Sequence, residues 1–598
     1  MHLNLDLDTM SDSLPPGPGR PRRRARGESM KRREYDYVIV GSGPAGCACA
    51  AAILENAPDD AALRVAVLER GPRLDRDARA NAAFPSALAA PGGPRRTGYA
   101  ALASAPFANC NYFGAGAAVG GGSAVNAGAL VGDAAYWRDG DRWPASAAWA
   151  PAAMERAAAA VLERLGVPAA PFGAPPADWL RACGKRGFRS TGISAAVPGT
   201  AFGPRVAFDG NGYRLDAASL IADETGAPRD ARLDLVAGAE VASLLAGPDG
   251  GASGARLADG SAVYAARCVV LAAGPEESAR LADGANAAVG ARFLDHPSVA
   301  VPVVDARRIG APALCAALLV VVAATRYRGA AAAAAALLAC AAARAARERA
   351  EGARAAAAPR YRGAAFGRTY QLSYLPGQCV LFMLGLYGGE CRNWRGGRPP
   401  APLGRGASAA LRLAAAVGRR GLRWSGGREV LGVGAVVATV SRPRTVRAAR
   451  DGPPPPLHAA DVLTLADGLA DAIAVAESLT EDRRPPPSLL DAGLERAVRR
   501  VLILLDLAPP RSAAGAAAFI RRRAGTLWHP AGGCARGAAL DPDTHELYGL
   551  PRCRVAGSAS LAALPAANPM LACYAVGWRL GELLAAAGLA HPSEHPPE

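Results

Sequence analysis

Residues 35–50 have the sequence YDYVIVGSGPAGCACA, in which a short apolar run leads directly into three closely spaced glycines. The apolar run predicts a buried β-strand at 37–40, and the glycines predict a tight loop at 41–46 that continues as a helix from 47 to 55. A second apolar run, LRVAVL at 63–68, predicts the next parallel strand. These segments together have the size of one βαβ unit.

The three glycines, Gly41, Gly43 and Gly46, have the spacing GxGxxG between the predicted strand and helix. The first permits a tight turn, the second lets a pyrophosphate approach the backbone, and the third lets helix and strand pack closely. The helix N-terminus then faces the phosphate charge. Glu69 ends the second strand, where its carboxylate can accept hydrogen bonds from ribose hydroxyls. The sequence therefore predicts that a dinucleotide binds at Gly41, Ser42, Gly43, Pro44, Ala45, Gly46, Glu69 and Arg70.

The composition indicates a globular protein. The chain has 598 residues, of which 51% are hydrophobic and 20% charged, and its mean hydropathy is +0.09. Its length allows two or three domains. The formal net charge of +16 could attract nucleic acid or anionic lipid. However, Ala, Gly, Pro and Arg are enriched together and no nucleic-acid-binding motif is found, so we favour a compositional bias and expect no nucleic-acid partner.

The cysteines and the N-terminal segment give indications of the cellular compartment of the protein. The twelve cysteines show no paired spacing, and no Cys/His set has metal-ligand spacing, so we expect no metal site and favour an intracellular location. Residues 1–34 are polar, basic and without an apolar stretch, which predicts a disordered tail rather than a secretory signal peptide. Ala313–Thr325 is apolar but shorter than the ~20 residues that span a bilayer, so membrane contact stays an open question.

Further motifs indicate which dinucleotide binds. On seven stretches, which occur in the same order along the chain, the sequence resembles the glucose–methanol–choline (GMC) oxidoreductases, FAD enzymes that act on alcohols. These stretches are YDYVIVGSGPAGCACA at 35–50, VGGGSAVNAG at 119–128, DGNGYR at 209–214, VVLAAGPEESARLA at 269–282, VGARFLDHP at 289–297, VSRPRTVR at 440–447, and the C-terminal block from Trp528 to the helix containing GELLAA. The matches leave most of 300–435 uncovered.

The resemblance implies further contacts with FAD. Val241 would place backbone groups against adenine, and Gly274 would lie near the dinucleotide. The loop with Gly121, Ser123 and Asn126 would lie near the flavin or its phosphates. Gly557 and Ser558 would lie near the ribityl phosphate, where many members have an acidic residue instead. Residues 72–126 contain no histidine for the usual covalent link, so we expect FAD to be bound non-covalently.

The C-terminal block contains the candidate catalytic residues. Alcohol oxidation moves a hydride to flavin N5 and a proton off the oxygen, and the imidazole of His529 is suited to take that proton as general base. Asn568 could hold the same oxygen by a hydrogen bond, and Pro569 suits the first turn of a helix whose N-terminus points at the flavin. Family members have His at the first position and His or Asn at the second. Of the other histidines, His296 is expected to be structural and His545 to lie in a surface hairpin loop.

The expected fold is α/β, α+β overall, with a Rossmann-like FAD-binding domain of the GMC type and a discontinuous substrate domain built on an antiparallel sheet. The FAD-binding domain is predicted from 35–150, 205–300 and 525–590, the substrate domain from 151–204 and 301–524, and tails at 1–34 and 591–598.

The leading functional hypothesis is an FAD-dependent alcohol dehydrogenase or oxidase, with a small-molecule alcohol as substrate and oxygen or a quinone as electron acceptor. Two alternatives stay open, because a flavin fold does not determine the reaction. One is a lyase or decarboxylase on the same scaffold. The other is a non-catalytic flavoprotein, which would fit the abnormal Ala/Arg composition of 300–435 and Arg536, at a position where the family usually has Met.

Overall fold

The computed structural model describes residues 33–57, 62–73, 116–168, 177–303, 363–376, 431–437, 457–481 and 508–590, with short breaks inside these ranges and a few isolated positions between 443 and 503. Almost all of the predicted N-terminal tail, the apolar segment Ala313–Thr325 and residues 591–598 lie outside the described residues, so what the sequence predicts for them stays a prediction.

The first sheet contains the predicted βαβ unit. Its parallel strands are β1 (Arg33–Val40), β2 (Val65–Glu69), β7 (Leu233–Ala237), β10 (Ala262–Leu271) and β18 (Cys553–Val555). They follow the order β7-β2-β1-β10-β18, and the antiparallel strands β9 (Ala252–Leu257) and β8 (Val241–Ala246) extend the sheet from β10. β1 begins at Arg33, four residues before the predicted strand 37–40, because Arg33 pairs with Val263 of the long strand β10.

Both faces of this sheet are covered. Tyr37 and Ile39 belong to the core that includes helices α1 (Pro44–Asn56), α6 (Pro151–Arg164) and α17 (Met570–Ala590), whereas Val38 and Val40 belong to a second core that reaches helix α8 (Gly274–Leu281). A parallel strand buried on both faces is apolar without alternation. This explains why the run before the glycine loop has no polar residue at every second position.

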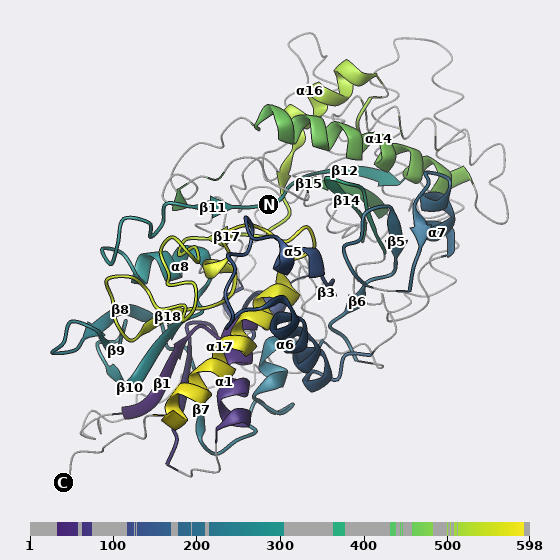
Figure 1. Cartoon of the computed structure of the whole chain (residues 1–598). Coiled ribbons are helices and arrows are strands. Elements are labelled where there is room, and N and C mark those ends of the chain that lie inside the picture. The colour runs from purple at the N-terminus through teal and green to yellow at the C-terminus, as the bar shows by residue number, and fades with distance from the viewer. Residues whose placement is uncertain are drawn as a thin grey trace, which may run out of the picture.

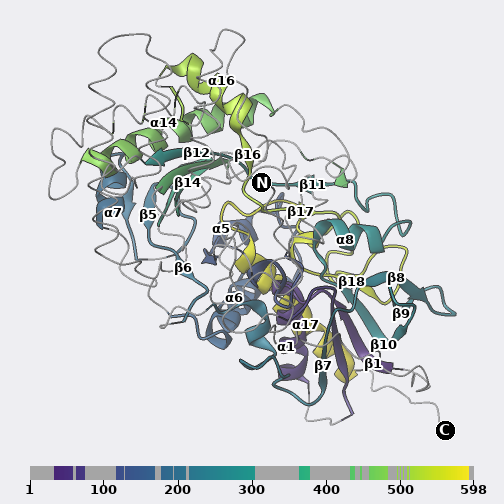
Figure 2. The ribbon, with the colours of Figure 1, turned by 180° about the vertical axis from the view of Figure 1, so that it is seen from behind.

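Helix α17 lies alongside α1 in both views of the ribbon (Figures 1 and 2). The two helices approach closely because small residues face each other: a side chain at Gly577 would overlap the carbonyl of Ala45, and one at Gly581 would lie 2.5 Å from the carbonyl oxygen of Cys49. Among the described residues, α17 is apolar and long enough to cross a membrane, but 72% of the window Met570–Ala587 is buried inside the protein. Packing against α1 and α6 accounts for its composition.

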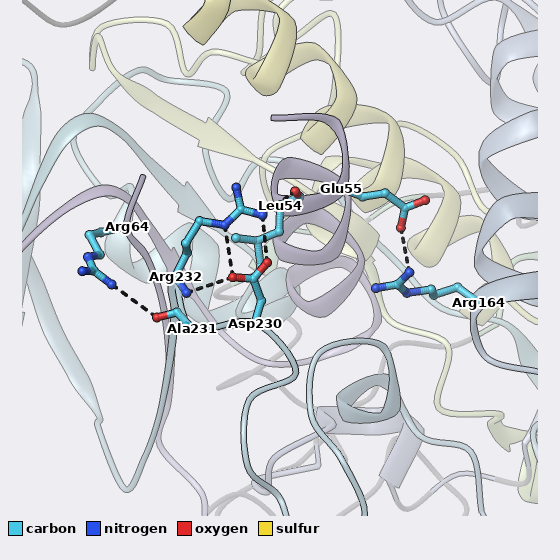
Figure 3. Close-up of polar contacts among 7 residues, drawn as sticks. All are labelled: Leu54, Glu55, Arg64, Arg164, Asp230, Ala231 and Arg232. Atoms are coloured by element: carbon cyan, nitrogen blue, oxygen red, sulfur yellow. Dashed lines mark hydrogen bonds and ion pairs between the residues drawn. The ribbon is translucent and has the colours of Figure 1, made fainter. Parts of the chain in front are cut away.

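A cluster of charged residues holds the far end of α1 (Figure 3). Arg232 donates from Nη2 to the carbonyl of Leu54 at 2.9 Å and pairs with Asp230 at 2.8 Å. Leu54 is in the last turn of α1, where carbonyls have no partner within the helix and a cation is favourable. Glu55 forms an exposed ion pair with Arg164 of α6 at 3.1 Å. The end of α1 remote from the glycine loop is thereby tied to β7 and α6.

The second sheet lies at the other end of the molecule (Figure 1). Its strands, in spatial order, are β16 (Gly525–Thr526), β12 (Pro297–Val303), β15 (Leu431–Val437), β14 (Tyr370–Pro376), β13 (Gly363–Phe366), β5 (Thr200–Phe202) and β4 (Arg189–Ser190). All neighbours are antiparallel except β4 and β5. Helices α14 (Ala459–Glu481), α7 (Ala177–Gly184) and α16 (Ala513–Arg523) share a buried core with this sheet.

The predicted domain bounds do not coincide with the two sheets. β12 continues through residue 300, and α6, which the bounds assign to the substrate domain, packs against α17 beside the first sheet. The apolar face of α6 includes Met154 and Val161, which are wholly buried there. The bounds stay a prediction.

Candidate active site

The glycine loop combines two packed glycines with one that faces open space. Gly41 has φ +102, and a side chain there would lie 2.6 Å from the carbonyl oxygen of Ala272 in the strand-end loop after β10. A side chain at Gly46 would overlap the carbonyl of Gly41. At Gly43, which precedes the first residue of α1, an added Cβ would meet nothing within 4 Å. The loop thus leaves room in front of the helix N-terminus, where phosphate charge is favourable.

Glu69 joins this loop to its neighbours. The buried carboxylate accepts from the amide and hydroxyl of Ser42 through Oε2, at 3.1 and 2.7 Å, and from the amide of Gly71 through Oε1, at 2.9 Å. Burial raises the pKa of Glu69, and these hydrogen bonds oppose that shift. The Ser42 hydroxyl also accepts from the amide of Gly120 at 3.2 Å. A carboxylate can accept about four hydrogen bonds, so acceptor capacity is left for the predicted ribose contact.

The second glycine-rich loop lies directly against the first. Gly121 opens the short 3-10 helix η2 (Gly121–Ala124), and a side chain there would lie 2.7 Å from the Cα of Gly43. Ser123 is buried and its hydroxyl donates to the carbonyl of Gly120 at 2.6 Å. Buried Arg214 donates to the carbonyls of Ser123 and Asn126 at 2.9 and 2.7 Å. Ser123 and Asn126 therefore hold this loop in shape, whatever further contact they make with a ligand.

Three more predicted cofactor residues lie at the same edge of the first sheet. Gly557, with φ +76, begins the 3-10 helix η5 (Gly557–Ser560), and a side chain there would lie 2.7 Å from the Cβ of Ala45 in α1. Ser558 follows it in η5. Gly274 has φ +82, begins α8 and has open space around an added Cβ. This edge holds the carboxyl ends of the parallel strands, where α/β sheets bind ligands.

Two further predicted cofactor residues, Val241 and Arg70, lie beside α8. Val241 begins β8, and its carbonyl accepts from Nη2 of Arg280 at 2.9 Å, so one of its two backbone groups already has a protein partner. Arg70 forms an ion pair with Glu277 of α8 at 3.6 Å. The structure thus places Arg70 and Val241 beside α8, whereas Gly43 and Gly121 adjoin each other at the start of α1.

The arrangement fits a dinucleotide. A helix N-terminus and two glycine-rich loops border the space that a side chain at Gly43 would enter, and a buried carboxylate closes the end of the second strand. Among the described residues, no group of three His, Cys, Asp or Glu side chains could hold a metal ion.

His529 and Asn568 come together although they are far apart in sequence. Asn568 Nδ2 lies 3.1 Å from His529 Nε2. Asn568 stands just before α17, and the carbonyl of Pro569 accepts from the amide of Cys573 at 2.9 Å, so the first hydrogen-bonded turn of the helix begins at Pro569. Burial, and secondarily the neighbouring His296, hold the pKa of His529 well below its usual value. His529 is therefore neutral at pH 7 and can accept a proton.

His296 was expected to be structural, but its ring contacts the candidate base directly. His296 is wholly buried, and its Nδ1 lies 2.8 Å from Nδ1 of His529. The Asp295 carboxylate accepts from the amides of both histidines, at 2.7 Å for His296 and 2.9 Å for His529. The string Asp-His-Pro was visible in the sequence, but no local pattern indicates which distant residue its histidine meets.

The second sheet contributes a residue that the sequence did not suggest. Gln371 of β14 is wholly buried and donates from Nε2 to Oδ1 of Asn568 at 3.4 Å and to the hydroxyl of Ser373 at 3.2 Å. It lies in the part of the chain that carries no recognisable motif. The only signal was a polar residue in a run otherwise compatible with a strand, and such residues are common at strand surfaces.

His545 does not lie in a surface loop. It is wholly buried, with its ring stacked on Trp149 at a centroid distance of 3.8 Å, and burial lowers its pKa to about 3. Arg536 lies beside it, 4.4 Å from the ring centroid of Trp143, and donates from Nε to the carbonyl of Pro542 at 2.9 Å. The arginine is thus accommodated by aromatic and carbonyl partners, which explains how the position accepts it in place of Met.

The two adjoining glycine-rich loops, with Gly41–Gly46 and Gly121, form what we call the glycine cradle. The fold and this cradle define the class of dinucleotide-binding flavoproteins. Within that class the chain belongs to the GMC oxidoreductases: the N-terminal family model matches residues 35–298 and the C-terminal model matches residues 453–577. The family's cofactor is FAD. The fold is accordingly the GMC-type α/β fold, with a mixed FAD-binding sheet and an antiparallel substrate-domain sheet, as the sequence predicted.

Solved structures with the same fold include three oxidases. A formate oxidase of Aspergillus oryzae RIB40, studied for modification of its FAD, is 14% identical, with a TM-score of 0.55 and coverage of 94% of this chain and 99% of the other. Pyridoxine 4-oxidase from Mesorbium loti is 15% identical, with a TM-score of 0.55 and coverage of 94% and 100%. A fungal aryl-alcohol oxidase is 15% identical, with a TM-score of 0.52 and coverage of 94% and 100%. No curated protein matches the chain.

Proposed function

We propose that this GMC oxidoreductase oxidises a small-molecule alcohol at its CH–OH group, with His529 as the general base. The observation that carries the proposal is the meeting of His529 Nε2 with the amide of Asn568, 3.1 Å apart, at the start of α17. The same helix packs along α1, whose N-terminus borders the glycine cradle. Asn568, which contacts the candidate base, and the glycine loop therefore each precede one of two helices that are in direct contact.

Each protein group has a role in the proton chemistry. His529 takes the hydroxyl proton at Nε2, because burial keeps the ring neutral at pH 7. The alcohol oxygen would lie between His529 and Asn568 in place of their direct contact, accepting from Nδ2 of Asn568, which orients the C–H bond. FAD, when bound, supplies the hydride acceptor, flavin N5. The loops with Gly41–Gly46, Gly121 and Gly557 would hold it, and Glu69 would accept from its ribose hydroxyls.

The finer features of the reaction are also part of the proposal. FAD is bound non-covalently, because residues 72–126 contain no histidine for the usual attachment. The electron acceptor is oxygen or a quinone. Pyridoxine 4-oxidase and aryl-alcohol oxidase, which share the fold, support a small alcohol as the substrate class. The same likeness supports an oxidase or dehydrogenase over a lyase.

The decisive experiment is anaerobic reduction of the bound flavin by a panel of primary alcohols, sugars and sterols. We expect His529→Ala to retain FAD and to slow flavin reduction by about a hundredfold to ten-thousandfold, the contribution typical of a general base. His458→Ala is the matched control, since His458 is exposed at the start of α14. Normal flavin reduction in His529→Ala would refute the role of His529. Product formation without flavin bleaching would favour a lyase instead.

A further inference from the structure

The backbone places His296 and His529 opposite each other. Two chain segments run antiparallel, and they are paired on both sides of the histidines: Leu294 of β11 (Phe293–Leu294) pairs with Ala531 of β17 (Ala531–Gly532), and Pro297 pairs with Thr526. Between these pairings, the Asp295 carboxylate accepts from the backbone amides of both histidines. The approach of the two rings is therefore determined by the strand register and by one shared carboxylate.

The short distance between the two rings requires a hydrogen bond between them. Their Nδ1 atoms are 2.8 Å apart, and the ring planes are inclined at 81°. Two ring nitrogens approach to this distance when one carries a hydrogen and the other presents its lone pair. One histidine therefore donates from Nδ1 and the other accepts at Nδ1.

The contact at Nε2 of His529 shows which of the two rings donates from Nδ1. Its Nε2 lies 3.1 Å from Nδ2 of Asn568, an amide nitrogen that only donates. The amide is oriented by Gln371, which donates to its Oδ1 at 3.4 Å. Because Nε2 accepts, the proton of the neutral His529 ring lies on Nδ1 and is donated to His296. The donations run in one direction, from Gln371 through Asn568 and His529 to His296.

We propose that His296 is a positioning residue that accepts the Nδ1 proton of His529 and, together with the amide of Asn568, keeps Nε2 of His529 unprotonated. This inference rests on the proposed role of His529 as base. In the other tautomer, Nε2 would carry a hydrogen and could not take the hydroxyl proton. After proton abstraction, the His529 cation still donates from Nδ1 to the neutral His296 ring. The partner of a catalytic imidazole thus selects its tautomer, as orienting groups do in other enzymes.

Two substitutions separate this role from simple packing. His296→Phe keeps a ring of similar size but offers no acceptor, whereas His296→Asn can place an amide oxygen near the position of Nδ1. Neither substitution removes a group that takes part in the Asp295 contact with His529 or in the flanking strand pairings. A purely structural role predicts that Phe is tolerated at least as well as Asn, because the site is wholly buried. The positioning role predicts the reverse.

The test is the ring ¹⁵N signals of His529 in the FAD-containing enzyme, assigned by their loss in His529→Ala. We expect protonated Nδ1 and unprotonated Nε2 in the wild type and in His296→Asn. In His296→Phe we expect a measurable population with protonated Nε2, because only the amide of Asn568 then opposes that tautomer. Flavin reduction should slow by about tenfold to a hundredfold in the Phe variant, the range typical of second partners of a functional histidine, and recover substantially with Asn.

Two results would overturn the inference: protonated Nε2 in the wild type, or an unchanged His529 tautomer in His296→Phe. The proposed function fails separately, through normal flavin reduction in His529→Ala. The tautomer is read from the nitrogen signals and the base role from the rate, so the two failures are distinguishable.

Discussion

Two histidines, His529 and His545, are surrounded by protein and have pKa values lowered chiefly by burial, yet their neighbourhoods differ. His545 is wholly buried, stacked on Trp149, and its Nδ1 lies 3.0 Å from the carbonyl oxygen of Val555. His529 keeps some exposed surface and has polar side chains at both ring nitrogens. A lowered pKa therefore reports burial, whereas access and partners on both sides indicate a reacting group.

The difference extends to the elements around each ring. His545 lies in a cluster with the aromatic rings of Trp143 and Trp149 and the guanidinium of Arg536. This cluster packs the segment after β3 (Ala129–Leu130) against the C-terminal part of the chain. His529 lies in a segment that runs from β16 of the second sheet to β17, near the start of α17. We infer that the first neighbourhood stabilises the fold and that the second performs chemistry.

The largest effect should come from placing a side chain in the glycine cradle, where we expect FAD to bind. In Gly43→Val, the side chain would enter the open space before α1 where the pyrophosphate is expected, so FAD should be lost on purification. The flavin absorbance of the purified protein measures this directly. Gly140→Val is the control, since Gly140 is exposed and also has open space around an added Cβ. A yellow, fully loaded Gly43→Val protein would contradict the placement of the cofactor.

His545→Ala should have the opposite profile to His529→Ala. Removing a wholly buried ring that stacks on Trp149 should lower the free energy of unfolding by about 2–4 kcal/mol, a range typical of cavity-forming substitutions. Bound flavin should still be reduced at nearly the wild-type rate. Denaturant unfolding and anaerobic reduction of the same samples measure the two quantities. If reduction slowed as much as in His529→Ala, the distinction between the two neighbourhoods would be wrong.

The sequence predicts the parts of this molecule that depend on local patterns. The run 35–50 contains its own strand, loop and helix signals, so the first βαβ unit and its glycines follow from spacing alone. The second sheet as a class follows from the family resemblance. Its strand β14 (Tyr370–Pro376) lies in a region whose alanine-rich composition gives no clear periodicity, and so the contribution of Gln371 could not be foreseen.

The misjudged histidines show why the remaining contacts needed the structure. DPDTHELYG has the composition of an exposed turn, and His545 does have φ +59, but Trp149 from a distant part of the chain covers its ring. The sequence does not indicate the partner of His296, because its contact with His529 depends on pairings between β11, β12, β16 and β17, each short and without a sequence signal. Local propensity cannot indicate pairings that the tertiary structure imposes.

The pH dependence of flavin reduction should follow His529, whereas the pH dependence of stability should follow His545. Because the pKa of His529 is lowered, flavin reduction should stay constant as pH falls from 8 past 6.5 and decline only at lower pH. The pKa of His545 is about 3 in the folded protein, against about 6.5 when unfolded. The unfolded state therefore binds the proton first, and stability that is complete above pH ~6.5 is lost as pH falls toward 3.

His545→Phe should reduce the loss of unfolding free energy between pH 7.5 and pH 5 without moving the pH profile of flavin reduction. Chemical denaturation at the two pH values, with stopped-flow reduction on the same protein, tests both halves. A reduction rate that halves near pH 6.5 in the wild type would show that His529 titrates as a solvent-exposed histidine does. That result would remove the physical reason for its neutrality at pH 7.

The smallest effects should come from charges remote from both histidines, at the end of α1 (Figure 3). Arg232→Ala leaves the carbonyl of Leu54 without its donor and should cost about 1 kcal/mol of unfolding free energy, as a single hydrogen bond usually does. Arg164→Ala breaks only an exposed ion pair with Glu55, and should cost less than about 0.5 kcal/mol. Both variants should keep FAD and reduce it normally, because the glycine loop lies at the opposite end of the helix. Loss of FAD in Arg232→Ala would instead mean that the contacts at the C-terminal end of α1 determine whether the glycine cradle can bind FAD.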